Sequence, residues 1–274
     1  MRNPEEITLT QYSQAHLAYL AKVKRYRRLI LVARVAVLVA IVFLWELSAR
    51  LGWVDTFAVS SPSRVMATMY RMAADGSLYY HTWITVWETT IGFTVGTLSG
   101  AAVAILLWWS NTLSKIMDPY IVVLNSIPKV ALGPLFIVWM GNGMPAIIAM
   151  ALAIAVIVTI MMVYNGFQNV DSNYLKLMQT FGATKGQMLR KVILPASVPT
   201  IISALKVNVG MSLVGAIMGE FLVSKAGLGF LIVYGGQVFK MDLIITGVVV
   251  LCIVSAFLYY LVSFLENRLL RWQE

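Results

Sequence analysis

Four polar side chains lie within long apolar runs of the sequence, where an ionisable or hydrogen-bonding group can act on a solute: Lys129, Lys206, Asn208 and Glu220. Such residues are costly in hydrocarbon and are often functional. Lys129 can meet an anionic substrate or form a structural pair, and Lys206 can line a path or extend its amine to the membrane interface. Asn208 can donate and accept hydrogen bonds inside a bundle. Glu220, near the outer end of its run, can contribute to an outer gate.

Linear catalytic motifs are absent from the sequence. It has no G-x-x-x-x-G-K-[ST] phosphate loop, no H-E-x-x-H zinc motif, no G-x-S-x-G nucleophile motif and no cluster of Cys and His. Its single cysteine, Cys252, lies in an apolar run, and both histidines, His16 and His81, fall outside the predicted spans. We therefore predict no catalytic residue, no metal site and no cofactor in this chain.

A polar and basic segment, residues 171–195, separates two apolar runs. Asp171 or Ser172 can cap a short helix, because a side-chain oxygen there satisfies free backbone N–H groups. Gly182 is expected to break this helix. Between cap and break, apolar side chains recur at helical spacing and predict one apolar face. The face consists of Tyr174, Leu177, Met178 and Phe181.

A second short helix is predicted to begin at Thr184, because Thr184 to Gln187 has the T-x-x-Q form of a capping box. Pro195 either ends this helix or begins the next span. We predict that the two helices lie outside the bilayer and dock on another protein. Further residues of this candidate docking segment are Lys176, Lys185, Arg190, Leu194 and Pro195.

The elements that must position these residues are membrane-spanning helices. Of the 274 residues, 59% are hydrophobic and 12% are charged, whereas a soluble domain has about 25% charged residues. A helical span needs about 20 apolar residues. The runs predict an all-α polytopic membrane protein with about six transmembrane helices. They cover approximately residues 29–49, 83–109, 119–140, 146–166, 199–223 and 242–265.

Details of these runs predict how the helices pack. Glycines recur every four residues from Gly92 to Gly100, which allows close approach of a neighbouring helix in lipid. Glu88, near the start of the same run, is either interfacial or paired with a basic residue of the bundle. The third run is expected to be interrupted at Pro128 and Pro134. Residues 110–118 and 224–241 are predicted as loops.

The basic residues predict the orientation of the chain in the membrane. Residues 1–28 form a polar arm that ends in a basic cluster, and residues 29–274 form the transmembrane domain. Most Lys and Arg lie in the arm, in residues 171–195 and in the C-terminal tail. These segments are expected to be cytoplasmic, with both termini inside. The net charge of +9 is attributed to this bias and to anionic lipid, not to nucleic acid.

Several motifs, in a consistent order over most of the chain, resemble the permease subunits of bacterial ABC importers. Gly182 followed by Leu194-Pro195 looks like their EAA signature. The sequences 61–63, 127–135, 141–143 and 227–229 resemble the nitrate, sulfonate and taurine subfamily. One departure is that Lys176-Leu177-Met178 occupies the place of Glu-Ala-Ala. Docking is therefore expected to use another charge pattern, or a partner that is not a generic, shared ATPase.

The resemblance implies a type I importer permease fold with cytoplasmic coupling helices in the bacterial inner membrane. It implies two permease copies, taken as a homodimer, two cytoplasmic P-loop ATPases that bind ATP and Mg²⁺, and an extracytoplasmic substrate-binding protein. The implied cargo is a small organic or inorganic anion such as a sulfonate or nitrate. The alternative cargo is a thiamine-pyrimidine precursor or another small heterocycle.

Two other classes of function fit the sequence less well. An ion-coupled secondary transporter needs acidic coupling groups at the bilayer midplane, ideally in repeated halves, and the runs contain few carboxylates and no visible repeat. A membrane-embedded enzyme needs a catalytic constellation, which the sequence does not show.

Overall fold

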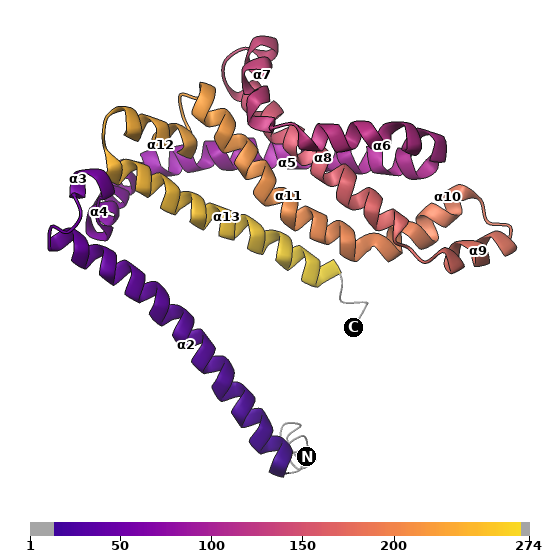
Figure 1. Ribbon diagram of the computed structural model, residues 1–274, viewed down its shortest axis with the longest axis horizontal. Helices are drawn as coiled ribbons and strands as arrows, with labels where there is room; N and C mark the ends of the chain where they lie inside the picture. Colours follow the sequence, from indigo (N-terminus) through magenta and orange to yellow (C-terminus); the bar gives the residue numbers. More distant parts are fainter. Residues whose placement is uncertain (1–13, 270–274) are drawn as a thin grey trace. The chain divides into compact units, whose positions relative to one another are not determined.

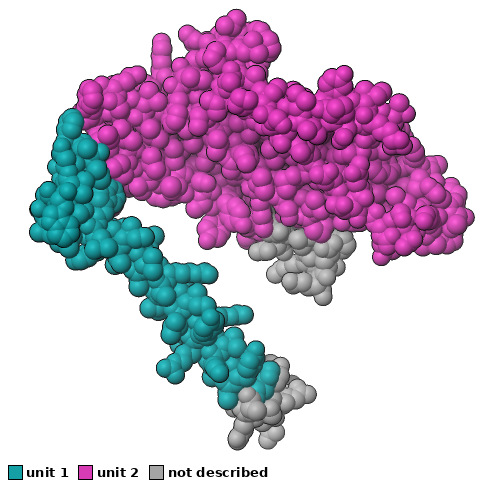
Figure 2. All heavy atoms as spheres, in the orientation of Figure 1, with its two compact units in different colours: residues 1–64 teal, residues 65–274 magenta. Residues whose placement is uncertain are grey.

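The computed structural model describes residues 14–269, and within that range every regular element is a helix (Figure 1). The chain divides into two compact units, residues 1–64 and 65–274 (Figure 2). The main helices are α2 (Gln14–Arg50), α3 (Thr56–Val59), α4 (Pro62–Ala74), α5 (Ser77–Trp109), α6 (Asn111–Ser126), α7 (Gly133–Met140), α8 (Met144–Gln168), α9 (Ser172–Thr180), α10 (Lys185–Met188), α11 (Leu194–Val223), α12 (Leu228–Gln237) and α13 (Met241–Leu269).

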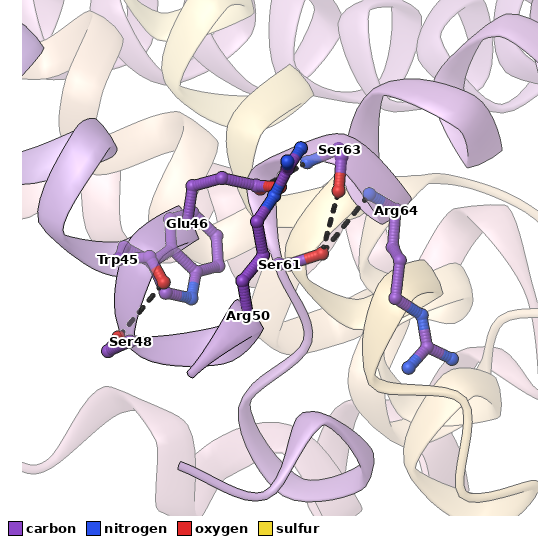
Figure 3. A network of polar contacts seen from close by, with 7 residues as sticks. All are labelled: Trp45, Glu46, Ser48, Arg50, Ser61, Ser63 and Arg64. Atoms are coloured by element: carbon purple, nitrogen blue, oxygen red, sulfur yellow. Dashed lines mark hydrogen bonds and ion pairs between the residues drawn. The ribbon is translucent and has the colours of Figure 1, made fainter. Parts of the chain in front are cut away.

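In the first unit, the end of α2 is tied to the start of α4 by polar contacts (Figure 3). The Glu46 carboxylate accepts a hydrogen bond from Arg50 Nε at 2.7 Å and another from the Ser63 backbone N–H at 3.1 Å. Ser61 Oγ accepts the Arg64 backbone N–H at 3.4 Å. These contacts fix the turn that the Ser-Ser-Pro-Ser sequence predicts as a helix start. The predicted boundary at residue 28 lies inside α2 and stays a prediction.

The second unit is built around α8, which packs against both α5 and α11. The predicted glycine spacing of α5 is confirmed as a packing surface, because an added Cβ would come within 2.6 Å of an α8 side chain at each position. The facing pairs are Gly92 with Ala151, Gly96 with Ala155, and Gly100 with Thr159. On α11, a Cβ at Gly215 would lie 2.6 Å from the Cα of Ala151. Ala151 is therefore enclosed by the backbones of both neighbours.

The third apolar run is broken as predicted, since α6 and the pair η1 (Lys129–Leu132) and α7 meet at a bend of 90°. The predicted loop over residues 110–118 is wrong. Ser110 Oγ accepts the Leu113 backbone N–H at 3.2 Å and begins α6, which continues through Pro119. The prediction failed because the stretch is polar, whereas the helix starts at a capping residue and not at an apolar one.

The predicted loop over residues 224–241 is also wrong, because it contains α12. Its glycines allow close packing rather than a loop: a Cβ at Gly229 would lie 2.8 Å from Glu220 Cβ, and one at Gly235 would lie 2.9 Å from Ile244 Cγ1. Several spans also start earlier than predicted. α5 begins at Ser77, so that His81 lies inside a candidate span, and α11 begins at Leu194.

The structure confirms a multi-pass helical membrane protein. Within the described residues, five helices are long and apolar enough to cross a membrane, and the bent pair of residues 111–126 and 129–140 brings the number to as many as six. In the second unit, Figure 1 shows α9 and α10 at one end of the long helices and α12 at the opposite end. The two ends therefore face opposite sides of the bilayer.

The glycine contacts of α5 can be tested with a matched pair of alanine variants. We expect Gly96→Ala to destabilise the chain by about 1–3 kcal/mol, because its methyl group would overlap Ala155 Cβ. Gly210→Ala, where an added Cβ meets nothing within 4 Å, should be neutral or stabilising by up to about 1 kcal/mol. Unfolding in mixed micelles measures both. Equal effects of the two substitutions would contradict the packing described here.

Candidate functional site

The segment of residues 171–195 folds into the two short helices expected from its caps. Asp171 begins α9, and its Oδ1 accepts the Asn173 backbone N–H at 2.9 Å. The chain then reverses at Gly182, which has φ +71°, a conformation that glycine adopts without a Cβ clash. The predicted cap and the predicted break are both confirmed.

The capping box of α10 is also confirmed. Thr184 Oγ1 accepts the Gln187 backbone N–H at 3.4 Å, and Gln187 Oε1 accepts the Thr184 backbone N–H at 2.8 Å. A π-helical turn, η2 (Leu189–Ile193), joins α10 to α11. Pro195 lies in the first turn of α11, where its missing N–H costs no intrahelical hydrogen bond. Of the two alternatives for Pro195, the structure supports the start of the next span.

The outer surface of this segment combines apolar and basic side chains. Phe181 is 78% exposed, Tyr174 is 58% exposed and Leu177 is 54% exposed. Met178 is only partly exposed. Asp171, Lys176, Lys185 and Arg190 are exposed as well. Large exposed apolar side chains beside charges are typical of a protein interaction site.

The inner surface of the segment is anchored to the long helices. Leu175 and Leu194 pack against the buried cluster that includes Phe167 of α8 and Ala204 of α11. Lys185 Nζ donates a hydrogen bond to the backbone carbonyl of Trp109, the last residue of α5, at 3.1 Å. The segment therefore contacts the ends of the three helices that form the centre of the unit.

The predicted substrate-path residues do not gather at one place. Lys129 is partly exposed, and its Nζ donates to the Asn125 carbonyl at 2.7 Å. Lys206 is partly buried, with its Nζ 5.8 Å from the centroid of the Tyr259 ring. Asn208 is buried in the bundle. Its Nδ2 donates to Thr97 Oγ1 at 2.9 Å and to Thr159 Oγ1 at 2.6 Å, so its role in packing is visible while a role in transport stays a prediction.

Glu220 lies buried at the end of the bundle near α12. Its Oε1 accepts the Thr85 hydroxyl at 2.6 Å, and its Oε2 accepts the Gly229 backbone N–H at 2.5 Å. Thr85 Oγ1 in turn accepts the Leu228 backbone N–H at 2.8 Å. Glu220 and Thr85 thus satisfy backbone donors at the start of α12 and hold this turn on α5.

Three residues near this turn were not among the predicted site residues: His81, Thr85 and Glu88. They follow one another at spacings of four and three residues, which places them on one face of α5. His81 Nδ1 accepts the Gly227 backbone N–H at 3.0 Å. Glu88 is 2% exposed and lies beside the Glu220 carboxyl. The expected pairing of Glu88 with a basic residue is not seen among the described residues, where its neighbour is acidic and it is in no salt bridge, and its depth in the membrane stays a prediction.

A cavity of about 600 Å³ opens next to these residues. Its wall is formed by the start of α5, the turn before α8 and the turn between α11 and α12, and includes Glu88, Asn142, Ser224 and Lys225. Among residues 14–269, no group of three or more His, Cys, Asp or Glu side chains could hold a metal ion.

A bundle of apolar helices with an exposed apolar and basic segment at one end and a cavity at the other is the architecture expected of a transport subunit. Residues 92–273 match the family described as "Binding-protein-dependent transport system inner membrane component". The match covers more than half of the chain, which therefore belongs to this family of ABC importer permeases. In this family the permease works with an ATPase, which is a separate subunit, and with a substrate-binding protein.

Curated relatives support this assignment. The chain is 31% identical over 228 residues to a probable ABC transporter permease of Haemophilus influenzae, covering 83% of this chain and 92% of the relative. It is 27% identical over 234 residues to a putative aliphatic sulfonates permease of Bacillus subtilis, covering 85% and 84%. It is 25% identical over 232 residues to a formylaminopyrimidine permease of Halalkalibacterium halodurans, covering 84% and 92%.

A solved structure supports the type I importer fold. A chain of a bacterial ABC transporter involved in the import of the acidic polysaccharide alginate aligns with a TM-score of 0.63. The alignment covers 92% of this chain and 99% of that chain, at 13% sequence identity. The structural likeness concerns the fold. The family membership excludes the secondary transporter and the membrane-embedded enzyme.

The capping box can be tested without changing any exposed apolar residue. We expect Thr184→Ala to speed amide hydrogen exchange in α10 about fivefold, because loss of a helix N-cap costs about 1 kcal/mol. Thr180→Ala is the control, since the Thr180 hydroxyl donates to the Leu177 carbonyl at 2.6 Å and caps no N–H. If both variants exchange like the unmodified chain, the capping contacts are not what holds α10.

Proposed function

We propose that residues 171–195 are the docking segment through which the ATPase drives this permease. The observation that carries the proposal is the exposed apolar face of Tyr174, Leu177 and Phe181 at the end of the long helices. In water such a face is unfavourable unless a partner covers it. Two cytoplasmic P-loop ATPases, which bind ATP and Mg²⁺, are the proposed partners.

The basic side chains suggest the chemistry of the partner surface. Lys176, Lys185 and Arg190 are exposed on the same segment as the apolar face, so that an apolar pocket with acidic residues near it is the complementary surface. Lys176 stands where related permeases carry an acidic residue. The partner is therefore proposed to differ in charge from an ATPase that serves those permeases.

The contacts that anchor the segment support a route by which movement of the ATPases reaches the membrane-spanning helices. Lys185 is hydrogen-bonded to the end of α5, and Leu175 and Leu194 pack against α8 and α11. When the ATPases close, displacement of the segment acts on all three helices at once. Rocking of this bundle would then alternate access between the two sides of the membrane.

The basic bias of the sequence supports an orientation in which the docking segment and both termini are cytoplasmic. The opposite end, with α12 and the cavity of about 600 Å³, then faces the substrate-binding protein. We propose a homodimer of this chain, since one copy offers a single docking segment for each of two ATPases.

The proposed cargo is a small organic or inorganic anion such as a sulfonate or nitrate. A relative named as an aliphatic sulfonates permease supports this cargo, and Lys129, which is partly exposed, lies at the bend of the third run. A thiamine-pyrimidine precursor or another small heterocycle is the alternative, supported by the relative named as a formylaminopyrimidine permease.

The docking proposal predicts a specific effect of removing one aromatic ring. Phe181→Ala should lower transport and ATPase stimulation about tenfold or more, because large buried aromatic residues dominate many interfaces. Its own folding should change little, since Phe181 is 78% exposed. Tyr70→Ala on α4, where the ring is 77% exposed, is the matched control. The readouts are co-purification of the ATPase and ATP hydrolysis in nanodiscs. Retention of both in Phe181→Ala would refute the proposal.

The anion proposal predicts an effect on substrate affinity. Lys129→Gln should raise the apparent KM for a sulfonate about tenfold, the loss expected for one charge-assisted hydrogen bond, with little change in maximal rate. Lys240→Gln, which removes an exposed amine, should leave KM unchanged. Uptake into proteoliposomes containing the complete transporter measures both. An unchanged KM in Lys129→Gln would remove Lys129 from the substrate path.

A further inference from the structure

Two carboxyl groups from different helices lie against each other inside the bundle. Glu88 on α5 is 2% exposed and Glu220 on α11 is 1% exposed. In the part of the chain that the structure describes, neither is in a salt bridge. Two neighbouring ionised carboxylates that are both removed from water repel each other strongly. One of the two must therefore be neutralised.

The contacts of Glu220 favour the ionised form of its carboxyl over that of Glu88. Both of its oxygens accept hydrogen bonds, one from Thr85 Oγ1 and one from the Gly229 backbone N–H. An ionised carboxylate only accepts hydrogen bonds, and this environment supplies donors. The backbone of Gly227, with φ +106°, approaches so closely that a Cβ there would lie 2.4 Å from the Glu220 carboxyl carbon.

Glu88 has the opposite environment. Its carboxyl is within hydrogen-bonding reach of Glu220, which offers only acceptor oxygens. Glu88 Oε2 is buried without a hydrogen-bond partner. Glu88 can bond to Glu220 only by donating a proton of its own. It also lines the cavity of about 600 Å³, through which a proton can reach it from water.

The neighbouring titratable groups do not neutralise the pair in place of this proton. His81 accepts the Gly227 N–H through Nδ1, which requires that nitrogen to be unprotonated, and Lys225 lines the cavity at its rim in the turn after α11. On α12, Tyr234 stacks on Phe230, and α13 carries Asp242 in its first turn. α7 has no ionisable side chain, and neither does the half of α8 that follows Met144.

We propose that Glu88 and Glu220 form a proton-binding site that fastens the turn of residues 224–229 to α5. Glu88 holds one proton and donates it to Glu220, so that the pair carries a single negative charge. When the proton leaves through the cavity, two like charges face each other. Glu88 then turns toward the cavity, and the turn at the start of α12 loosens. The site is independent of which cargo is carried and of how the ATPase docks.

The shared proton is directly observable by infrared spectroscopy of the full chain in nanodiscs. At neutral pH the unmodified chain should show the C=O stretching band of a protonated carboxylic acid, and the band should disappear as the pH rises. Glu88→Gln should lack it. Glu46→Gln, which removes a carboxylate of α2 that is paired with Arg50, should keep it. Absence of the band in the unmodified chain, or its persistence in Glu88→Gln, would overturn the proposal.

Hydrogen exchange of residues 224–229, corrected for the intrinsic pH dependence of exchange, tests whether this turn loosens when the proton leaves. Protection should fall about tenfold on raising the pH through the transition, the effect of losing one hydrogen bond to a charged group. Glu88→Gln should stay protected at all pH values, because its amide N–H replaces the shared proton. Glu220→Gln should be unprotected throughout, because Thr85 and Gly229 donate to different carboxylate oxygens, and the amide nitrogen that replaces one of these oxygens cannot accept a hydrogen bond.

The turn of residues 141–143, on the other side of the cavity, is the internal control and should show no such transition. Measurements in sodium chloride and in choline chloride at equal ionic strength separate a proton from a small metal cation. If protection follows sodium rather than pH, a cation occupies the pair and the proposal is wrong. Equal protection in Glu88→Gln and Glu220→Gln would also refute it.

Discussion

Close approach of α5 and α11 to α8 is the constraint on which the second unit depends. In lipid there is no hydrophobic drive for helices to associate, so that packing and hydrogen bonds must hold them together. Glycines on both neighbours allow this approach, and Ala151 lies between Gly92 and Gly215. Larger residues at these contacts would separate the backbones. The polar contacts between the helices, such as Asn208 with Thr159 at 2.6 Å, exist only because the backbones are close.

The same three helices connect the two ends of the unit. At one end Lys185 bonds to Trp109 of α5, and at the other Glu220 of α11 accepts the Thr85 hydroxyl of α5. A close-packed core transmits displacement instead of absorbing it. A movement imposed on residues 171–195 therefore has a physical route to the turn of residues 224–229 through packed helices.

Local features were readable from the sequence because their causes are local. The caps at Asp171 and Thr184, the reversal at Gly182 and the break at Pro128 each depend on a few neighbouring residues. Composition predicted a loop wrongly in two places. α6 begins with polar residues after Ser110, and α12 is rich in glycine. The contact of Glu88 with Glu220 was out of reach for another reason. Its cause is the pairing of two helices distant in sequence, and a single sequence does not show which faces meet.

The acidic end of the bundle bears on how cargo is recognised. Glu88 borders the cavity near α12, and a negative charge there would disfavour an anion in a site of low dielectric constant. With one proton on the pair, that charge lies on Glu220, whose two oxygens are covered by Thr85 and the Gly229 backbone N–H. The wall that faces the cavity is then a neutral carboxyl beside Lys225. The proposed proton on the pair would thus make the acidic composition of this end compatible with the proposed anionic cargo, whereas the alternative cargo, a pyrimidine with amine donors, would gain from the ionised form.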